Sequence, residues 1–336
     1  MNATTKYSLV IPFMNEEEVL PLLMDRLDGF MADLDGAAEV VFIDDGSRDN
    51  SAALVAERAR QDGRFKIIRL SRNFGHQIAV TAGLNEASGD AVIIMDADLQ
   101  DPPEVAHDLI AKWQEGYEIV HAQRRRRDGE TMFKKMSANL YYRMLAKLSS
   151  VDIPRDVGDF RLVDARVVRA IRAMPERDRF LRGMFAWVGF RQCLVQFDRP
   201  ERQAGETKYP LKKMLRLAMD GVISFSDAPL RMALWLGALV SLGAMLYGAY
   251  IFSLALFTDR LVDGWASTIV ILSFLSGMNL LISGVIGLFV GRIYTEAKQR
   301  PLYFVSESIG LTDVVRLPDQ RPETRHVFRT PYQAHG

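Results

Sequence analysis

The sequence predicts a doubly wound α/β domain followed by two membrane-spanning helices. Over the first 200 residues, short apolar segments alternate with segments whose apolar residues have helical spacing. The short segments are apolar throughout, which is typical of parallel strands covered by helices on both faces. Two long segments without charge follow beyond residue 230. A chain of 336 residues has room for both parts.

Strands and helices are expected in strict alternation along the first part. The first strand, Tyr7 to Pro12, ends at a proline, and Asn15 with the acids behind it is suited to cap the next helix. Further strands are expected at 40–43, 65–70, 91–95 and 118–122, and helices at 51–61, 77–87 and 103–115. Ligands of such sheets bind beyond the carboxyl ends of the strands, so a site is expected at that edge.

Polar clusters follow three of the expected strands. They are Asn15 to Glu17, the segment 44–47 (DDGS) and Asp96-Ala97-Asp98. Each cluster alone is equally well explained as a cap or a turn, but three on one sheet edge favour a ligand site. GxGxxG does not follow the first strand and GxxxxGK[ST] does not occur. The main sequence evidence for a dinucleotide-dependent dehydrogenase or a P-loop protein is therefore missing.

The stretch VIIMDADLQDPPE at 92–104 places Asp96 and Asp98 at the end of a buried strand. Two carboxylates this close repel each other unless a cation neutralises them, and hard oxygen ligands favour Mg²⁺ or Mn²⁺. An ion bridging a diphosphate would stabilise the charge that develops on a departing nucleoside diphosphate. Asp-x-Asp is short enough to arise by chance, so the motif alone is weak evidence for a metal site. Its position directly after a buried strand makes the evidence stronger.

The segments 232–258 and 264–291 contain no charged residue. Each exceeds the ~20 residues that a helix needs to cross a bilayer, although a buried core helix is the alternative. Basic residues flank the two segments at Arg216, Arg231, Arg292, Lys298 and Arg300, and the positive-inside rule then places both outer ends in the cytosol.

Composition gives three further expectations. Equal numbers of basic and acidic residues give no argument for a nucleic-acid partner. Cys193 is the single cysteine, which rules out an internal disulfide and fits a reducing compartment. The segment MNATTKYSLVIPF lacks the pattern of a signal peptide. We therefore expect an integral membrane protein whose soluble part lies in the cytosol.

Several motifs together resemble the family 2 glycosyltransferases with a GT-A fold. They are VIPFMNEEEVL, VFIDDGSRDNS, RLSRNFGHQIAVTAGL and MDADLQDPPE. Within that family, DVGDFRLVD, MPERDRFLRGMFAWVGFRQ and AGETKYPLKKMLRLAMDGVISFS, followed by two spans, are similar to the polyprenyl-phosphate glycosyltransferases. This group includes dolichyl-phosphate mannose synthases, and the bactoprenol (undecaprenyl-phosphate) glucosyltransferases are the more similar branch. The resemblance extends to about Gly310.

The resemblance implies roles for individual residues. Pro12, Asn15, Glu17, Asp44, Asp96 and Gln100 would bind the nucleotide sugar, and Asp96 and Asp98 would hold the metal. Asp159 matches the acid proposed as catalytic base. The second pKa of a phosphate monoester is about 6, so little proton removal is needed. We expect Asp159 to orient the acceptor or a cationic partner at least as much as to take a proton; a buried turn-capping Asp is the alternative.

Basic residues near the expected site are candidates for binding the acceptor phosphate. They are Arg124, Lys135, Arg202 and Lys208. Arginines bind phosphate bidentately, whereas the plain alternatives are a solvated face or attraction to anionic lipid. The segment 210–225 is expected as an amphipathic helix, either in the membrane interface or packed on the catalytic domain. In the tail, LYFV and VVRL are possible strands of a hairpin that contacts a neighbouring subunit, or part of a partly ordered end.

The expected organisation is a catalytic domain at 1–204, an acceptor loop and interfacial helix at 205–230, two transmembrane helices at 231–292 and a cytosolic tail at 293–336. The expected reaction is inverting, metal-dependent transfer of one hexose, glucose from UDP-glucose, to undecaprenyl phosphate. GDP-mannose or another UDP-sugar, such as an aminoarabinose derivative, is the alternative donor. A processive polysaccharide synthase has little support, because Gln-x-x-Arg-Trp does not occur. A non-catalytic scaffold and a homo-oligomer also remain open.

Overall fold

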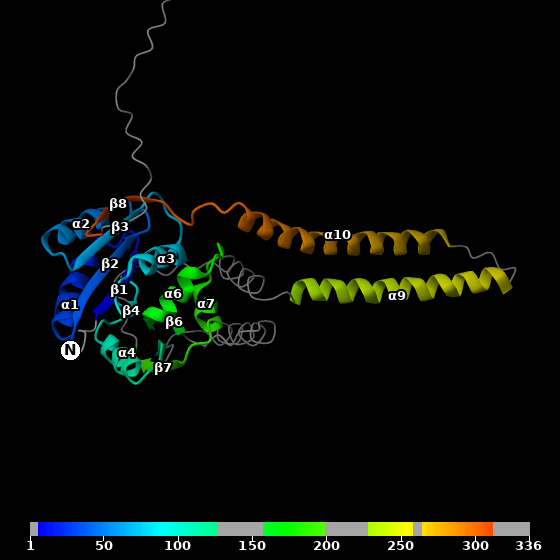
Figure 1. The fold of residues 1–336 in the computed structure, drawn as a ribbon. Helices are drawn as coiled ribbons and strands as arrows, with labels where there is room; N and C mark the ends of the chain where they lie inside the picture. Colours follow the sequence, from blue (N-terminus) through cyan, green and yellow to red (C-terminus); the bar gives the residue numbers. More distant parts are fainter. Residues whose placement is uncertain (1–5, 126–156, 199–227, 258–263, 312–336) are drawn as a thin grey trace, which may run out of the picture. The chain divides into compact units, whose positions relative to one another are not determined.

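A computed structural model describes residues 6–125, 157–198, 228–257 and 264–311 (Figure 1). The chain divides into two compact units. The first contains Met1–Leu99 together with Leu302–Gly336, and the second contains Gln100–Pro301. Strands β1 to β4 belong to the first unit, which also takes in a strand from far along the chain.

The first unit is an α/β sheet with one added edge strand. Its elements are β1 (Lys6–Phe13), α1 (Leu20–Ala32), β2 (Ala37–Asp44), α2 (Ser51–Gln61), β3 (Phe65–Leu70), α3 (His76–Glu86), β4 (Ala91–Ile94) and β8 (Val305–Ile309). The strand order is β4-β1-β2-β3-β8. Pairs within β4-β1-β2-β3 are parallel, and β8 is antiparallel to β3. The predicted alternation and parallel sheet are confirmed here.

Burial explains why these strands read as apolar along their whole length. From Tyr7 to Phe13, every residue of β1 is buried, and so are the last six residues of β2. Helix α3 lies so close to the sheet that a Cβ on Gly83 would overlap the side chains of Val10 and Ile43. A sheet covered in this way leaves its strand ends as the accessible part, which is where the polar clusters lie.

The predicted helix cap at Asn15 is wrong. Helix α1 begins at Leu20 with Val19 at its N-cap position, and no side chain caps it. Asn15 has a φ of 57° and accepts a hydrogen bond from the backbone N–H of Arg48. Its side chain therefore bonds across to the neighbouring loop and not to its own helix. Asparagine tolerates this left-handed conformation better than most residues.

The second unit has three strands and five helices among its described residues. They are α4 (Val105–Gln114), β5 (Ile119–Arg124), β6 (Val157–Asp164), α6 (Ala165–Ala173), α7 (Leu181–Trp187), β7 (Gln192–Phe197), α9 (Ala228–Phe257) and α10 (Trp265–Ala297). Strand β5 lies between β6, to which it is antiparallel, and β7, to which it is parallel. The sequence did not reveal β6 and β7, because β6 carries charges at Asp159 and Arg161.

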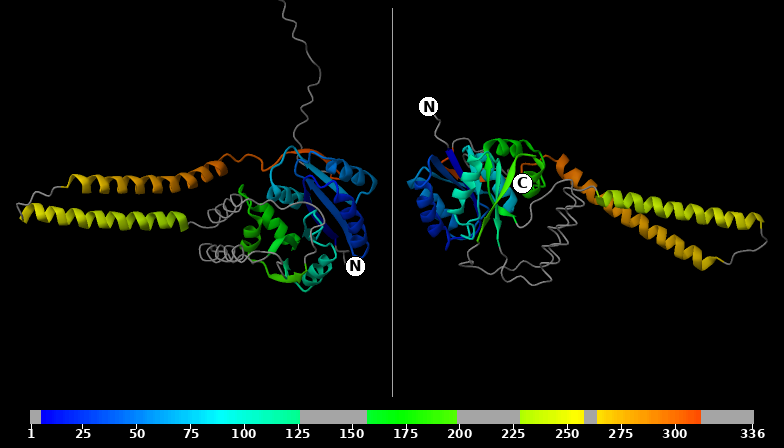
Figure 2. Two further views of the ribbon diagram at one scale, coloured as in Figure 1. Left: turned by 180° about the vertical axis from the view of Figure 1, so that it is seen from behind. Right: turned by 90° about the horizontal axis from the view of Figure 1, so that it is seen from below.

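Helices α9 and α10 run side by side in opposite directions (Figures 1 and 2). Within them, Met232–Leu254 and Val270–Ala297 are long and apolar enough to cross a membrane, with mean hydropathies of 1.7 and 1.9. Only 6% and 0% of the residues in their most apolar windows are buried inside the protein. A buried core helix, the alternative considered above, does not have such an exposed apolar surface.

Candidate active site

The loops after β1 and β2 are tied together by side chains predicted to bind nucleotide. The backbone N–H of Asn15 donates to Oγ of Ser47 over 3.0 Å, and the N–H of Arg48 donates to Oδ1 of Asn15 over 2.8 Å. Oε2 of Glu17 accepts from the N–H of Asn50 over 2.9 Å. Pro12 is buried in β1, opposite Ile43 of β2. The polar groups of Asn15 and Glu17 thus hold the two loops at one edge of the sheet.

Asp44 ends β2 as a fully buried carboxylate. Its Oδ1 accepts a hydrogen bond of 2.7 Å from the N–H of Ser47, and Nε of Arg69 lies 3.2 Å from Oδ2 in an ion pair. Oδ2 itself forms no hydrogen bond with the described residues. A buried acceptor without a hydrogen bond is costly, so this oxygen is suited to receive a donor group from a ligand.

Asp45 holds the start of α3. Its carboxylate accepts hydrogen bonds from the backbone N–H groups of Phe74, over 2.7 Å, and Gly75, over 3.0 Å. Burial raises the pKa of Asp45, although these two backbone donors act in the opposite direction. The loop around it leaves no room for a side chain at Gly46, where φ is +80° and a Cβ would lie 2.7 Å from the N of Asn73.

Asp96 and Asp98 follow β4 and are both half-buried. Strand β4 pairs with β1 through Val10 and Ile94, so these acids emerge at the same edge as the β1–α1 loop. Nε2 of His76, at the start of α3, lies 3.8 Å from Oδ1 of Asp96. Asp44, Asp45, Asp96 and Asp98 thus all lie at the carboxyl edge of the first unit, as predicted.

The donor set fits a hard divalent cation. Among the described residues, three or more His, Cys, Asp or Glu side chains are nowhere grouped so as to hold a metal ion by themselves. Mg²⁺ is commonly bound by one or two carboxylates, with the other positions filled by water and substrate phosphates. Asp96 and Asp98 supply two half-exposed carboxylates one residue apart, which meets that requirement.

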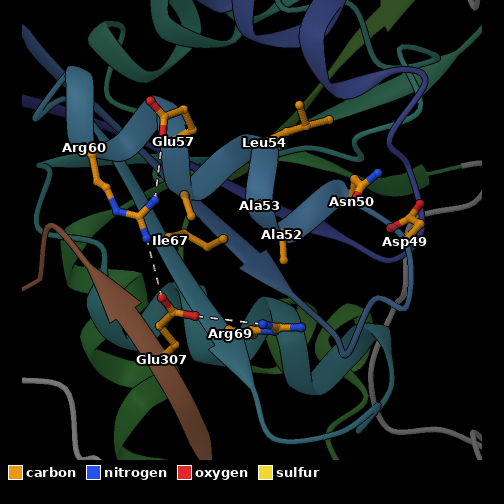
Figure 3. A pocket seen from close by; sticks show the side chains of 11 residues that line it. Asp49, Asn50, Ala52, Ala53, Leu54, Glu57, Arg60, Ile67, Arg69 and Glu307 are labelled. Atoms are coloured by element: carbon orange, nitrogen blue, oxygen red, sulfur yellow. Dashed lines mark ion pairs between the residues drawn. The ribbon is translucent and has the colours of Figure 1, made fainter.

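A cavity of about 620 Å³ is lined in part by Arg69, the exposed arginine that pairs with the buried Asp44. Figure 3 shows it bordered by α2, by Ile67 and Arg69 of β3, and by Glu307 of β8. Oε2 of Glu307 lies 3.9 Å from Nη1 of Arg69, and Oε1 of Glu307 lies 4.0 Å from Nη2 of Arg60. The sequence did not reveal this cavity, because β8 comes from a distant part of the chain.

In the second unit, Asp159 is held by two arginines. Nε of Arg182 donates to Oδ1 of Asp159 over 3.0 Å, and Nη2 of Arg161 lies 3.5 Å from the same oxygen. Arg161 also donates to the backbone oxygens of Gly158 and Asp159. Asp159 is therefore an ion-pair partner of both arginines, and its expected orienting role in the reaction stays a prediction.

Behind Asp159 lies a buried cluster that sequence reasoning missed. The guanidinium of Arg161 lies 4.7 Å from the ring centroid of Phe185, and burial lowers the pKa of Arg161 to about 10 although Asp159 opposes this. Burial, followed by the charge of Arg161, lowers the pKa of His121 to about 4. Nε2 of His121 lies 2.9 Å from Oε1 of Gln192. At neutral pH the cluster therefore holds a charged arginine and a neutral histidine.

The structure describes only some of the remaining residues predicted for the site. Gln100 is buried, with 8% of its surface exposed. Arg124 ends β5, and its Nη2 would lie 3.2 Å from a Cβ on Gly158, so it packs beside the Asp159 turn. Lys135, Arg202, Lys208 and the expected helix at 210–225 lie outside the described residues. The phosphate-binding role of these basic residues stays a prediction.

Comparison with known proteins decides the family. The family model described as Glycosyl transferase family 2 matches residues 8–172. The chain is 49% identical over 320 residues to "Uncharacterized glycosyltransferase YkcC" of Bacillus subtilis (strain 168), covering 95% of this chain and 99% of that protein. The chain belongs to glycosyl transferase family 2. This family 2 enzyme is a glycosyltransferase with a GT-A fold, as its sequence motifs predicted.

Two further relatives of this glycosyltransferase have names that include a reaction. It is 39% identical to "Prophage bactoprenol glucosyl transferase homolog" of Escherichia coli (strain K12), over 89% of this chain and 98% of that protein. It is 40% identical to "Bactoprenol glucosyl transferase" of Shigella phage SfII, over 90% of this chain and 98% of that protein. Similarity of this extent takes in both the catalytic part and the long apolar helices.

Proposed function

We propose that this glycosyltransferase moves one glucose from UDP-glucose to undecaprenyl phosphate, with inversion at the anomeric carbon. The observation that carries the proposal is the similarity to bactoprenol glucosyl transferases over about nine-tenths of the chain, which includes the helices α9 and α10. A water-soluble donor and a lipid acceptor require both a soluble site and contact with a membrane. The chain supplies a sheet edge rich in acids and two exposed apolar helices.

The donor nucleotide is proposed to bind at the carboxyl edge of the first unit. Asp44 would accept a hydrogen bond from the base or ribose, since its buried Oδ2 lacks one. Asn15 and Glu17 keep the adjoining loops in place through their bonds to Arg48 and Asn50. Pro12 would line the nucleotide, and Gln100 would lie near the sugar or phosphate.

Asp96 and Asp98 are proposed to hold Mg²⁺ or Mn²⁺ together with the donor diphosphate. When bound, such an ion neutralises charge on the departing nucleoside diphosphate. The chain's own part is to present two half-exposed carboxylates and to keep one of them near His76. Carboxylate ligands bind metal ions in their deprotonated form, so metal binding is expected to weaken at low pH.

Asp159 is proposed to orient the acceptor phosphate through its arginines. A phosphate monoester is largely dianionic near neutral pH, so attack on the sugar needs little help from a base. Oδ1 of Asp159 is already shared by Arg161 and Arg182, and Arg182 is 35% exposed. A partly exposed guanidinium fixed in this way is preorganised to bind a second anion, and Arg124 beside Gly158 would assist it.

The apolar helices α9 and α10 are proposed to anchor the enzyme in the bacterial inner membrane with its catalytic part in the cytosol. Basic residues on the outer flanks of both helices support this orientation. The anchor brings the enzyme to the leaflet in which the acceptor lipid lies. Association into a homo-oligomer is compatible with the exposed helix faces.

The proposal is tested with purified full-length protein, undecaprenyl phosphate and a panel of radiolabelled nucleotide sugars, with and without Mg²⁺. Chloroform-extractable label is expected from UDP-glucose and only with the metal. Label from GDP-mannose or another UDP-sugar would change the donor, and free polymer would indicate a polysaccharide synthase. Asp98→Ala is expected to abolish transfer. Asp90→Ala, which changes the exposed residue directly before β4, is expected to leave transfer intact. Full transfer by Asp98→Ala would support the scaffold alternative.

A further inference from the structure

The cytosolic end of α10 is bonded to one loop of the catalytic part. This loop, residues 174–180, connects α6 to α7 and is called the α6–α7 loop below. Nη2 of Arg292 lies 3.0 Å from Oδ2 of Asp178. Oε1 of Glu296, one turn further along α10, accepts a hydrogen bond of 2.9 Å from the backbone N–H of Arg177. The last two turns of α10 thus hold two successive residues of the loop.

The other side of the α6–α7 loop is held by the end of α6. The guanidinium of Arg179 donates to the backbone oxygen of Ile171 over 3.0 Å and to that of Met174 over 2.6 Å. These oxygens belong to the end of α6, where helix carbonyls lack partners within the helix. The loop therefore has fixed contacts on both sides and little freedom to move by itself.

Helix α7 connects the α6–α7 loop to Asp159. It begins at Leu181, directly after the loop, and the backbone oxygen of Phe180 accepts from the N–H groups of Gly183 and Met184. Arg182 in the first turn of α7 donates to Oδ1 of Asp159 over 3.0 Å. Only three residues separate Arg182 from Asp178, the residue that pairs with Arg292.

We propose that Arg292 and Glu296 are positioning residues, which set Arg182 and Asp159 at the height where the membrane presents the acceptor phosphate. The inference rests on the proposed function, because it requires an acceptor whose phosphate is fixed at the membrane surface. Residues 264–291 carry no charge, and the 27 of them that belong to α10 span about 40 Å, more than the ~30 Å hydrocarbon core. Arg292 and Glu296 are the first charged residues after this span, so they lie at the level of the headgroups.

Exposure argues against a purely structural role for these contacts. Asp178 is 56% exposed and Arg292 29% exposed, and ion pairs of this kind add little to folding stability. Three contacts, including one of 3.4 Å between Nη2 of Arg177 and the backbone oxygen of Pro301, nevertheless converge on one loop. Their loss is therefore expected to change where Arg182 lies relative to the membrane more than whether the protein folds.

The test compares two acceptors in the same proteoliposomes that contain full-length protein. One is undecaprenyl phosphate in the bilayer, and the other is a water-soluble phosphate with two isoprene units. Arg292→Asp and Asp178→Arg are each expected to lower kcat/KM for the bilayer acceptor about threefold to fivefold, the factor that a partly exposed ion pair supplies. The soluble acceptor diffuses freely to the site and is expected to keep its value. The double swap Arg292→Asp with Asp178→Arg restores the pair and is expected to recover the bilayer acceptor.

Two controls separate positioning from folding. Lys112→Glu reverses one charge of the exposed pair Lys112–Glu115 in α4 and is expected to leave both acceptors unchanged. Glu296→Gln keeps an oxygen for the N–H of Arg177 and is expected to behave as wild type, whereas Glu296→Ala behaves as Arg292→Asp. This second comparison suffices by itself if a charge reversal prevents accumulation of folded protein.

The inference is overturned if the single variants keep the wild-type ratio of the two acceptors, if they lose both acceptors equally, or if the double swap does not restore the ratio. Failure of the proposed function has a different signature. In that case the wild-type protein glucosylates neither acceptor.

Discussion

The buried His121 makes the stability of the catalytic part sensitive to acid. Burial and the charge of Arg161 lower its pKa to about 4, whereas a histidine in an unfolded chain titrates near 6.5. The unfolded chain therefore takes up the proton first as the pH falls. His121 favours the folded state fully above pH 6.5, and this contribution is lost progressively between pH 6.5 and about 4.

The size of the effect follows from the same two values. One pH unit corresponds to about 1.4 kcal/mol, so the lowered pKa of His121 is equivalent to about 3 kcal/mol over the whole window and about 2 kcal/mol at pH 5. His121→Gln removes the titrating group and keeps a side-chain N–H that can donate to Oε1 of Gln192, the partner of Nε2 in the wild type. The variant is therefore expected to lose less stability in acid than the wild type.

The measurement is the thermal unfolding midpoint of full-length protein in detergent between pH 7.5 and 4.5. The wild-type midpoint is expected to fall more steeply than that of His121→Gln below pH 6.5, and the two curves are expected to run parallel above it. His107→Gln, a change of a histidine that is less buried, serves as the matched control and is expected to follow the wild type. Equal slopes for wild type and His121→Gln would refute the account of the buried cluster.

Three further changes test other parts of the structure. Gly46→Ala is expected to lower the free energy of unfolding by about 2 kcal/mol in thermal unfolding, because φ is +80° and the new Cβ would meet the backbone at Asn73. Gly63→Ala, where nothing lies within 4 Å of the new Cβ, should have little effect. Asp159→Ala leaves the buried Arg161 without its partner carboxylate, so it is expected to lower the free energy of unfolding by about 3 kcal/mol and to remove most of the transfer activity. Asp198→Ala, which breaks an exposed pair with Arg125, should change neither the stability nor the activity. A stable Asp159→Ala protein would contradict this. Asp44→Asn weakens the pair with Arg69 and is expected to raise the KM for the donor about tenfold with a smaller change in kcat; an unchanged KM would place the nucleotide elsewhere.

The parts of the fold that depend on local pattern could be predicted from the sequence. Helix α2 and strand β3 have the predicted bounds, and β4 differs from prediction by one residue. Each is a run of apolar residues with clear turn signals at its ends. The long helices α9 and α10 were predictable for the same reason, because a charge-free run of that length leaves few alternatives.

The parts that depend on long-range contacts could not be predicted. β8 was expected at LYFV but lies at Val305–Ile309, where Ser306 and Glu307 interrupt the apolar pattern of an edge strand. Asn15 looked like a helix cap because a cap depends only on nearby residues, whereas its actual partner is Arg48 in another loop. A tertiary hydrogen bond of this kind has no signature in the sequence around Asn15.

The acidic strand ends were predicted, but their partners were not. Asp96, Asp98 and Asp159 were identified from motifs, whereas Arg161, Arg182 and His121 were not. One signal was available for Arg161. An arginine in the middle of VGDFRLVD, between apolar residues, is costly to bury and therefore indicates a charged partner nearby.

The central claim is that the acids after β4 bind a divalent ion together with the donor diphosphate. Calorimetric titration of full-length protein with UDP in the presence and absence of Mn²⁺ tests it most directly. Wild-type protein is expected to bind UDP at least tenfold more tightly with Mn²⁺, and Asp98→Ala is expected to lose this difference while Asp90→Ala retains it. UDP binding that is equally tight without the metal, or an undiminished metal effect in Asp98→Ala, would contradict the account.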